Sequence, residues 1–321
     1  MELPKRKTVL AAIGSLTLLG VLFGVAWGLS HLAGNIRHTA QLETSPDIKS
    51  PEKITVPSFK TLTEKTQLRS ENGKTNILLL GISGEDYISG DVADTIILLS
   101  LEHETQKAYL FSLPRDLWIS YDGTFQKINE LYRVAGGSEV PDAQKTEIMK
   151  GKVQEITGLN IHYSVVINLA GTERVVDLIG GVETEEGHKN GKEALFYIRD
   201  RSRAGGDFDR MARQQKLIIA ILEKVSNGEV LLNDEKGDII ETYQEYFSTD
   251  ISILQFLQIE PVISKMGADS VEMHTITPAL DNLLYSDMTD SNGQMLYTLH
   301  PTAGYENYSE IQKFIGEILN K

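Results

Sequence analysis

Residues 75–80 read T-N-I-L-L-L and are followed by Gly81. A short continuous apolar run that ends at a glycine is typical of a buried β-strand. Four more strands are predicted from runs of a similar kind, at residues 95–101, 108–113, 161–168 and 271–277. The first two of these four are joined by the polar stretch 102–107, which predicts a hairpin. The chain therefore has the strands of a sheet with a hydrophobic interior.

Helices are predicted between and after these strands, at residues 142–157, 169–179, 208–226, 252–266 and 309–319. Gly180-Gly181 ends the second of them, and Asn227-Gly228 ends the third. Asp207 stands where an N-cap residue would precede the third helix. Strands mixed with helices throughout predict a three-layer α/β/α fold with a mixed central sheet. No segment after residue 72 has the character of a separate domain.

The N-terminus has the pattern of a membrane anchor. Residues 5–7 are Lys-Arg-Lys, residues 8–29 contain no charged residue, and the next formal positive charge is Arg37. A helix of this length spans roughly 33 Å, enough for a bilayer core. The charge distribution predicts one transmembrane helix with a cytoplasmic N-terminus and an extracytoplasmic remainder. A cleaved signal peptide is the alternative, but its apolar region is usually shorter, and Trp27 suits an interfacial anchor.

Three segments are predicted along the chain. Residues 1–30 form the cytoplasmic N-terminus and the anchor, and residues 31–72 form an extracytoplasmic linker. The linker is rich in Thr, Ser, Lys and Glu and carries spaced prolines, which is typical of an extended tether. Residues 73–321 form the globular domain.

The overall charge limits the partners. The formal net charge is −14 and the sequence pI is about 5.0. A protein this acidic is a poor candidate for binding nucleic acid, and an anionic substrate would need a local cluster of positive charge. The chain has no cysteine, which excludes thiolate nucleophiles and cysteine metal sites.

Such a positive cluster exists. Five of the eleven arginines lie within fifteen residues: Arg199, Arg201, Arg203, Arg210 and Arg213. A guanidinium binds phosphate oxygens in pairs. Arg210, Arg213 and Gln214 have the spacing of one helix face, in the first turns of a helix, where free backbone N–H groups favour an anion. The alternative is a solvated surface on which Asp200, Asp207 and Asp209 pair with these arginines.

Charged residues also stand at the ends of the predicted hairpin. Asp94 opens its first strand, and Arg115 and Asp116 follow its second strand. Strand ends are where α/β proteins build their sites. Taken alone, Asp94 fits a turn or cap residue and Asp116 an arginine partner. Lys127-Ile128-Asn129 is compatible with either a structural or a functional role.

Taken together, the motifs resemble the LytR-CpsA-Psr family of cell-envelope phosphotransferases. The resemblance covers residues 75–321 and is carried by motifs in chain order: N-I-L-L-L-G (76–81), A-D-T-I (93–96), S-L-P-R-D (112–116), K-I-N (127–129), I-G-G-V (179–182), A-L-F-Y-I-R-D-R (194–201), D-F-D-R-M-A-R-Q-Q (207–215), T-D-I-S (249–252) and Y-S-E-I (308–311). A single tripeptide would carry no weight, whereas the ordered set is specific.

The resemblance implies a Mg²⁺-dependent enzyme that moves a glycopolymer from a polyprenyl-pyrophosphate carrier to the cell wall (peptidoglycan). By position, Asp94 would bind Mg²⁺, and the polyprenyl chain would lie in an apolar tunnel between sheet and helices. The residues implied to hold the pyrophosphate are Arg115, Arg199, Arg201, Arg210 and Gln214, and the arginine cluster adds Arg213 as a candidate. Asp116 is the candidate base for the incoming sugar hydroxyl.

Two positions depart from the family pattern. Ser83 stands where a carboxylate is common, and Val92 stands where an arginine is common. These departures keep two alternatives open: a non-catalytic relative that binds lipid-linked polymer, and a polyprenyl-pyrophosphate hydrolase. Asp86 or Asp91 would be the substitute for the missing carboxylate.

Overall fold

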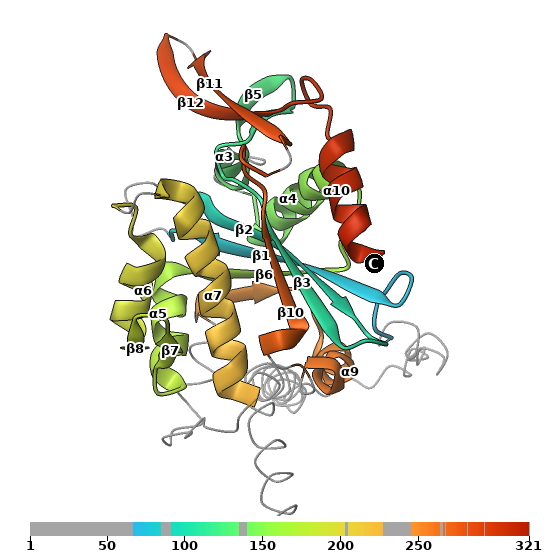
Figure 1. The fold of residues 1–321 in the computed structure, drawn as a ribbon, viewed down its shortest axis with the longest axis vertical. Helices are drawn as coiled ribbons and strands as arrows, with labels where there is room; N and C mark the ends of the chain where they lie inside the picture. The colour runs from blue at the N-terminus through green and yellow to red at the C-terminus, as the bar shows by residue number, and fades with distance from the viewer. Residues whose placement is uncertain are drawn as a thin grey trace, which may run out of the picture.

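The computed structural model describes residues 67–84, 91–134, 140–202, 205–226, 245–263, 266, 268–280, 282–291 and 293–320. At the centre of this part of the chain is a six-stranded sheet with the order β10-β3-β2-β1-β6-β9 (Figure 1). Its strands are β1 (Lys74–Ile82), β2 (Ala93–Glu102), β3 (Lys107–Ser112), β6 (Tyr163–Asn168), β9 (Phe247–Thr249) and β10 (Val271–Thr275). β1 is antiparallel to β2 and parallel to β6, so the sheet is mixed, as predicted. β2 and β3 form the predicted hairpin.

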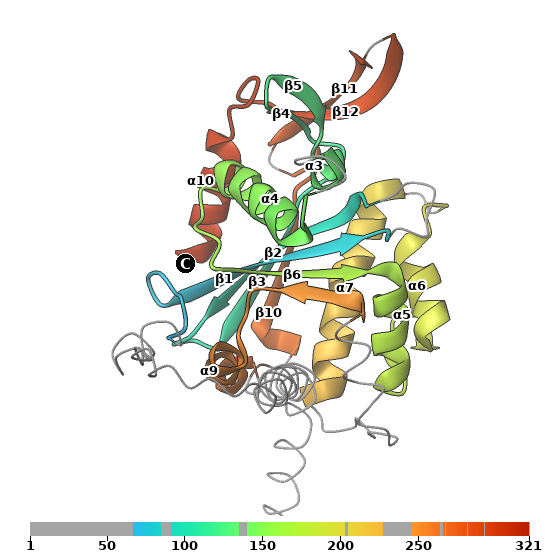
Figure 2. The same cartoon turned by 180° about the vertical axis from the view of Figure 1, so that it is seen from behind.

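Helices cover both faces of this sheet (Figures 1 and 2). One face carries α3 (Ile128–Val134), α4 (Asp142–Thr157) and α10 (Ser309–Leu319). The other face carries α5 (Leu169–Leu178), α6 (Gly191–Arg199), α7 (Gly206–Ser226) and α9 (Ile253–Ile263). Of these, α3 and α6 were not predicted as helices, whereas α4 and α10 begin and end at the predicted residues.

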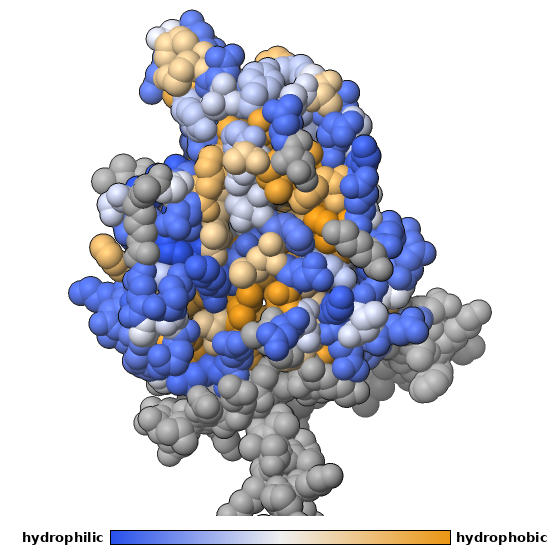
Figure 3. All heavy atoms as spheres, in the orientation of Figure 1, coloured by the Kyte–Doolittle hydropathy of each residue, from blue (hydrophilic) through white to orange (hydrophobic). Residues whose placement is uncertain are grey.

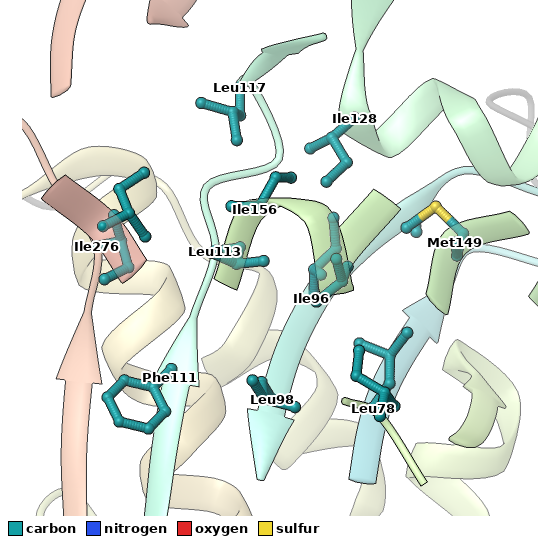
Figure 4. Packing of buried hydrophobic residues seen from close by; sticks show 14 of the residues in the cluster. Leu78, Ile96, Leu98, Phe111, Leu113, Leu117, Ile128, Met149, Ile156 and Ile276 are labelled. Atoms are coloured by element: carbon teal, nitrogen blue, oxygen red, sulfur yellow. The ribbon is translucent and has the colours of Figure 1, made fainter. Parts of the chain in front are cut away.

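The alternation of side chains along the strands separates two hydrophobic layers. The largest core cluster lies between the sheet and the helices α3, α4 and α10 (Figure 4). Its labelled members include Leu78, Ile96, Leu98, Phe111, Ile128, Met149 and Ile156. The neighbouring residues Leu79 and Leu99 point to the opposite face, where they are only partly buried. That second face, under α5 and α7, therefore has room for something other than core side chains.

The start of α7 differs from the prediction. The helix begins at Gly206, so Asp207 lies in its first turn and does not precede it as an N-cap. Gly206 has φ +55°, a left-handed conformation that glycine adopts without a steric penalty. This turn leaves the Asp207 carboxylate to bind arginines.

Three two-stranded hairpins were not predicted. They are β4–β5 (Trp118–Tyr121 with Thr124–Lys127), β7–β8 (Val182–Thr184 with Gly187–Lys189) and β11–β12 (Leu284–Ser291 with Gln294–Pro301). The β11–β12 hairpin projects from one end of the molecule (Figures 1 and 2). Its base is fixed to the loop after β3, because the Leu299 N–H donates to the Asp116 carbonyl at 3.0 Å.

Contacts to the body begin ahead of residue 73. The Arg69 guanidinium lies 4.1 Å from the centroid of the Tyr163 ring, and its Nη2 is 3.0 Å from Asp250 Oδ2.

None of the helices among the described residues combines the length and the apolarity needed to cross a bilayer. The predicted anchor at residues 8–29 lies outside those residues.

Candidate functional site

The site begins where β2 starts and β3 ends. Because the two strands are antiparallel, Asp94, the second residue of β2, and Arg115, just after β3, lie at the same end of the strands. Arg115 Nη1 donates to Asp94 Oδ1 at 2.5 Å. Both side chains are partly buried, with 19% of Arg115 and 26% of Asp94 exposed. The two residues expected at strand ends therefore form one ion pair.

Asp207 links this pair to the arginine cluster. Its Oδ1 is 3.4 Å from Arg115 Nε and 3.5 Å from Arg201 Nε. Arg210 binds the same carboxylate with two bonds, from Nε at 2.9 Å and from Nη2 at 3.2 Å. One carboxylate in the first turn of α7 thus positions three arginines from three segments of the chain.

A polar cavity of about 320 Å³ lies beside this network. It is lined by Gly81, Ser83, Asp94, Thr95, Leu169, Ile198, Arg199, Arg201, Arg210 and Gln214. In Figure 2 the end of β1 points toward the end of α6 and the start of α7, and the lining residues of the cavity come mainly from these segments. Five of the residues predicted to bind metal or pyrophosphate, namely Asp94, Arg199, Arg201, Arg210 and Gln214, therefore meet in one cavity.

Gly81 keeps this cavity open at the end of β1. A Cβ atom at that position would lie 2.8 Å from the Cβ and 2.9 Å from the Oγ1 of Thr95, which is too close for any side chain. Only glycine therefore fits opposite Thr95 at this point of the sheet. Its bare backbone lies on the boundary between the polar cavity and a second, apolar one.

The second cavity has a volume of about 250 Å³ and lies between the sheet and the helices α5 and α7. Its lining is almost entirely apolar: Leu79, Leu80, Gly81, Thr95, Val165, Ile167, Thr172, Val175, Ile198, Gln214, Leu217, Ile218, Ile221, Leu222 and Phe247. Four of these residues, Gly81, Thr95, Ile198 and Gln214, also line the polar cavity. The two cavities therefore adjoin, and together they match a ligand with an anionic head and a long apolar tail.

The charges around the polar cavity act strongly on one another. Burial opposes the charged form of Arg115, but Asp207 and Asp94 outweigh it and raise the pKa of Arg115. Burial, together with the nearby charges of Arg115 and Arg210, lowers the pKa of Arg201. Burial also disfavours the charged Asp207 carboxylate, but its bond to Arg210 prevails and lowers the pKa of Asp207. Positive charge is therefore crowded at Arg201, and a bound anion would relieve that crowding.

Arg213 has a different role from the predicted pyrophosphate contact. Its side chain is 1% exposed and does not line the polar cavity. The guanidinium donates to the carbonyls of Tyr197 and Asp200 and, at 3.1 Å, to Asp209 Oδ2. Arg213 thus connects α7 to the end of α6. It does not line the polar cavity, but it positions the segment that carries Arg199 and Arg201.

Asp116 lies on the other side of Arg115. Lys127 Nζ donates to Asp116 Oδ1 at 2.6 Å, and Arg115 Nε is 3.9 Å from Asp116 Oδ2. The K-I-N motif therefore contributes a lysine that positions the Asp116 carboxylate. Asn129 is the second residue of α3, and its backbone N–H donates to the Arg115 carbonyl at 3.3 Å.

Of the two predicted substitutes for the missing carboxylate, Asp91 lies away from the cavity. Asp91 Oδ2 is 3.8 Å from Lys145 Nζ on α4, and Asp91 does not line the polar cavity. Asp86 and Arg203 lie outside the described residues. Ser83 does line the cavity, whereas Val92 is buried and does not line it. Among the described residues, no group of three or more His, Asp or Glu side chains is arranged to hold a metal ion.

Two contributors were missed from the sequence alone. Asp207 was assigned as a helix cap or a surface partner, and Thr95 was given no role. The D-F-D-R motif held the available signal, because Asp207 and Arg210 are three residues apart on a helix and such pairs meet. Nothing local in the sequence indicates that Arg115 reaches the same carboxylate.

Comparisons with known proteins agree with this geometry. A sequence model described as the LytR_cpsA_psr family matches residues 38–312. A protein of Oceanobacillus iheyensis named polyisoprenyl-teichoic acid–peptidoglycan teichoic acid transferase TagU is 29% identical over 250 residues, covering 71% of this chain and 75% of that protein. The protein of the same name from Bacillus subtilis is 27% identical over 270 residues, covering 77% and 79%.

Solved structures share the fold. The crystal structure of B. subtilis TagV superposes with a TM-score of 0.57 at 23% identity, covering 78% of this chain and 99% of that one. A structure described as TagT bound to LI-WTA has the same TM-score at 20% identity, covering 79% and 94%. At these identities the structural likeness supports the fold alone.

Proposed function

Because this chain belongs to the LytR_cpsA_psr family, we propose that it is a phosphotransferase of the cell envelope. Its donor is a glycopolymer on a polyprenyl-pyrophosphate carrier, and its acceptor is the peptidoglycan of the wall. The names of the relatives from Oceanobacillus iheyensis and Bacillus subtilis, both teichoic acid transferases, support this class of reaction.

One observation carries the proposal: an arginine-lined cavity adjoins an apolar one, and four residues are common to both. A pyrophosphate needs paired hydrogen-bond donors and positive charge, which Arg199, Arg201 and Arg210 supply. A polyprenyl chain needs a water-free apolar surface, and each methylene that it buries contributes about 0.8 kcal/mol. A soluble nucleotide or sugar phosphate has no long apolar group that would fill the apolar cavity.

The reaction follows from these positions. The oxygen of an acceptor hydroxyl forms a bond to the phosphorus on the sugar side of the pyrophosphate. The bond from that phosphorus to the bridging oxygen breaks, and polyprenyl phosphate leaves with the electron pair. The hydroxyl proton passes to the Asp116 carboxylate. Such transfer depends on positioning and charge neutralisation, because it needs no covalent bond to the protein.

The arginines divide this work. Arg199, Arg201 and Arg210 line the cavity and hold the phosphate oxygens. Arg115 contacts Asp94, Asp116 and Asp207, so it fixes the relative positions of the metal ligand, the base and the arginine cluster. Gln214 lies at the junction of the two cavities and donates to the pyrophosphate where the prenyl chain begins.

The donor groups fit Mg²⁺. Asp94 and Ser83 line the cavity that would hold the pyrophosphate, and Mg²⁺ is usually bound by one or two carboxylates plus phosphate oxygens and water. The ion would neutralise negative charge that develops on the phosphate oxygens during transfer. Asp94 is the carboxylate that would hold it, and Ser83 would contribute a neutral oxygen.

Substrate and metal are therefore expected to bind cooperatively. Because Asp94 is the one carboxylate among the described residues that line the polar cavity, the full chain should bind Mg²⁺ weakly alone and clearly when inorganic pyrophosphate is present, as measured by titration calorimetry. Ser83→Asp should strengthen binding of Mg²⁺ alone, and Ser309→Asp, at an exposed position on α10, should not. Tight Mg²⁺ binding to the free parent protein that Ser83→Asp leaves unchanged would place the metal elsewhere.

Binding of a prenyl pyrophosphate tests the proposed function. Farnesyl pyrophosphate should bind the full chain more tightly than inorganic pyrophosphate, because its tail enters the apolar cavity. Arg199→Ala should weaken both ligands by about tenfold or more, since a charge-assisted bond contributes about 1.5–3 kcal/mol. Ile218→Asp should weaken the prenyl ligand only, because Ile218 lines the apolar cavity alone.

Arg133→Ala is the matched control, since this arginine is half exposed and pairs with Glu130 on α3, away from both cavities. It should leave both affinities unchanged. If the parent, Arg199→Ala and Ile218→Asp bind both ligands equally, the arginine cluster is only a solvated surface and the proposed site is wrong.

The same proposal includes a topology, with the globular domain on the extracytoplasmic side of the membrane. The charge pattern of residues 5–29 predicts an uncleaved anchor with residues 38–321 on the extracytoplasmic side. Protease added to spheroplasts should therefore digest the domain, while a cytoplasmic marker protein in the same cells stays intact. Protection of the domain to the same extent as the marker would contradict this topology.

A further inference from the structure

A third cavity lies next to Asp116, and we propose that it binds the acceptor, an uncharged sugar chain. The proposal rests on the function proposed above. The cavity has a volume of about 230 Å³, several times the roughly 30 Å³ that one water occupies in the liquid. It is lined by Asp116, Gly205, Gly206, Asp207, Phe208, Tyr297 and Leu299.

The two carboxylates of this cavity, Asp116 and Asp207, form ion pairs with arginines of the donor site. Arg115 lies between the two, with Nη1 at 2.5 Å from Asp94 Oδ1 and Nε at 3.9 Å from Asp116 Oδ2. Asp207 lines the third cavity, while its carboxylate binds Arg210, which lines the donor cavity. A transfer enzyme must bring two substrates to one phosphorus, and the contacts of Arg115 and Asp207 connect the two cavities.

The walls of the cavity leave it open on one side. Gly205 and Gly206 present bare backbone, and a Cβ on Gly205 would lie 2.6 Å from the Asp209 Cβ. Leu299, which is 1% exposed, forms the buried end, while Tyr297 is 42% exposed at the mouth. A ligand can therefore enter past Tyr297 and reach the Asp116 carboxylate.

An exposed apolar strip continues from Tyr297 along the β11–β12 hairpin. Tyr297 is paired with Met288 on β11, and Met295 lies two residues before Tyr297 on β12, nearer the tip of the hairpin. All three side chains therefore lie on the same face as Leu299. Met288 is 52% exposed and Met295 55%. Figure 3 shows this hairpin projecting from the body, with apolar atoms near its tip between hydrophilic ones. From Leu299 to Met295 the strip follows four residue steps of β12, roughly 13 Å.

The chemistry of the strip identifies the occupant. Sugar rings present weakly positive C–H groups that pack on the negative face of an aromatic ring, and their hydroxyls donate to carboxylates such as Asp116. Neither strand of the hairpin contains Lys or Arg, and Asp287 and Asp290 add negative charge. A polymer of phosphates and an anionic lipid surface are both repelled here. An uncharged sugar chain of the wall fits.

The position of this chain suits the transfer step. A hydroxyl on the ring beside Asp116 gives its proton to that carboxylate, and its oxygen forms the new bond to the sugar-side phosphorus. The bond to the bridging oxygen breaks, and polyprenyl phosphate leaves. Lys127, at 2.6 Å from Asp116, fixes the carboxylate on the side away from the acceptor.

The test compares two tyrosines of the same hairpin. Tyr297 lies on the proposed acceptor face, and Tyr285, which is 46% exposed, lies on the opposite face, paired with His300. Binding of the full chain to an uncharged glycan, an oligosaccharide of N-acetylglucosamine, is measured by calorimetry. Tyr297→Ala should weaken this binding by about fivefold, the value of one lost aromatic contact. Tyr285→Ala should bind as the parent does.

Further arms make the outcome decisive. Met288→Glu, on the same face as Tyr297, should also weaken glycan binding, so the result does not depend on one variant folding. Binding of farnesyl pyrophosphate should be unchanged in all three variants, which separates this proposal from the proposed function. No glycan binding by the parent, or equal losses in Tyr297→Ala and Tyr285→Ala, would overturn the acceptor assignment. Binding of anionic vesicles in place of glycan would identify the strip as a lipid contact and overturn it as well.

Discussion

Asp94→Asn is expected to lower the rate of polymer transfer by about a hundredfold or more, the usual effect of removing one group that stabilises developing charge. The substitution keeps the shape of the side chain but removes the only carboxylate among the described residues that line the polar cavity. It also weakens the bond that orients Arg115 at 2.5 Å. Both effects act on the transition state, so kcat should fall more than the affinity for the donor.

Asp122→Asn is the matched control for this substitution. Asp122 lies in the β4–β5 turn with φ +49°, a conformation that asparagine adopts readily, and it is exposed. Its transfer rate should equal that of the parent, and the midpoints of thermal unfolding of both variants should stay close to the parent's. A fully active Asp94→Asn protein would remove Asp94 from the chemistry.

Arg213→Ala should destabilise the fold by about 3 kcal/mol or more, since a buried charged partner and its hydrogen bonds are lost together. Arg213 is 1% exposed, and it is the donor for the carbonyls of Tyr197 and Asp200 at the end of α6. Arg213→Ala would take the guanidinium donor away from both carbonyls. It would also leave a buried cavity of about the size of the lost side chain. Urea unfolding should show a lower midpoint with an unchanged slope.

Arg201→Ala gives the contrasting result. Its side chain is 47% exposed and lines the polar cavity, so its loss should change the unfolding midpoint little and weaken pyrophosphate binding. The two arginines are close in sequence and belong to the same cluster. If Arg213→Ala unfolds at the parent's urea concentration, the structural role assigned to Arg213 is wrong.

The predicted parts of the fold are those with a local signal. β1, β2 and β3 are continuous apolar runs between turn residues, and α4 and α10 have boundaries that local sequence determines. The β11–β12 hairpin was missed because it packs against little. Its strand L-Y-S-D-M-T-D-S mixes polar and apolar residues on both faces, so the sequence lacks the contrast that marks a half-buried strand.

The site shows the same limit. The sequence assigned Arg210, Arg213 and Gln214 to one helix face. At about 100° per residue, the third residue on lies roughly 60° to one side and the fourth roughly 40° to the other. Arg210 and Gln214 therefore face the cavity while Arg213 faces α6. Which side of the helix faces the sheet is decided by tertiary packing.

Ser83 is the residue that best separates two hypotheses, an active transferase and a relative that only binds the lipid-linked donor. It lines the polar cavity with 4% exposure and adds no charge, so a bound Mg²⁺ would depend on Asp94 and on the oxygens of the substrate. An enzyme built this way would hold its metal only when the donor is bound. A non-catalytic relative would bind the donor and release nothing.

The most direct measurement follows a labelled saccharide on a polyprenyl-pyrophosphate carrier. The full chain is incubated with this donor, Mg²⁺ and isolated peptidoglycan, and both the wall-bound label and the released lipid are quantified. A transferase predicts label covalently attached to peptidoglycan, with one polyprenyl phosphate released for each saccharide transferred. Release of soluble sugar phosphate at the same rate without peptidoglycan, or donor that binds and stays intact, would contradict the account.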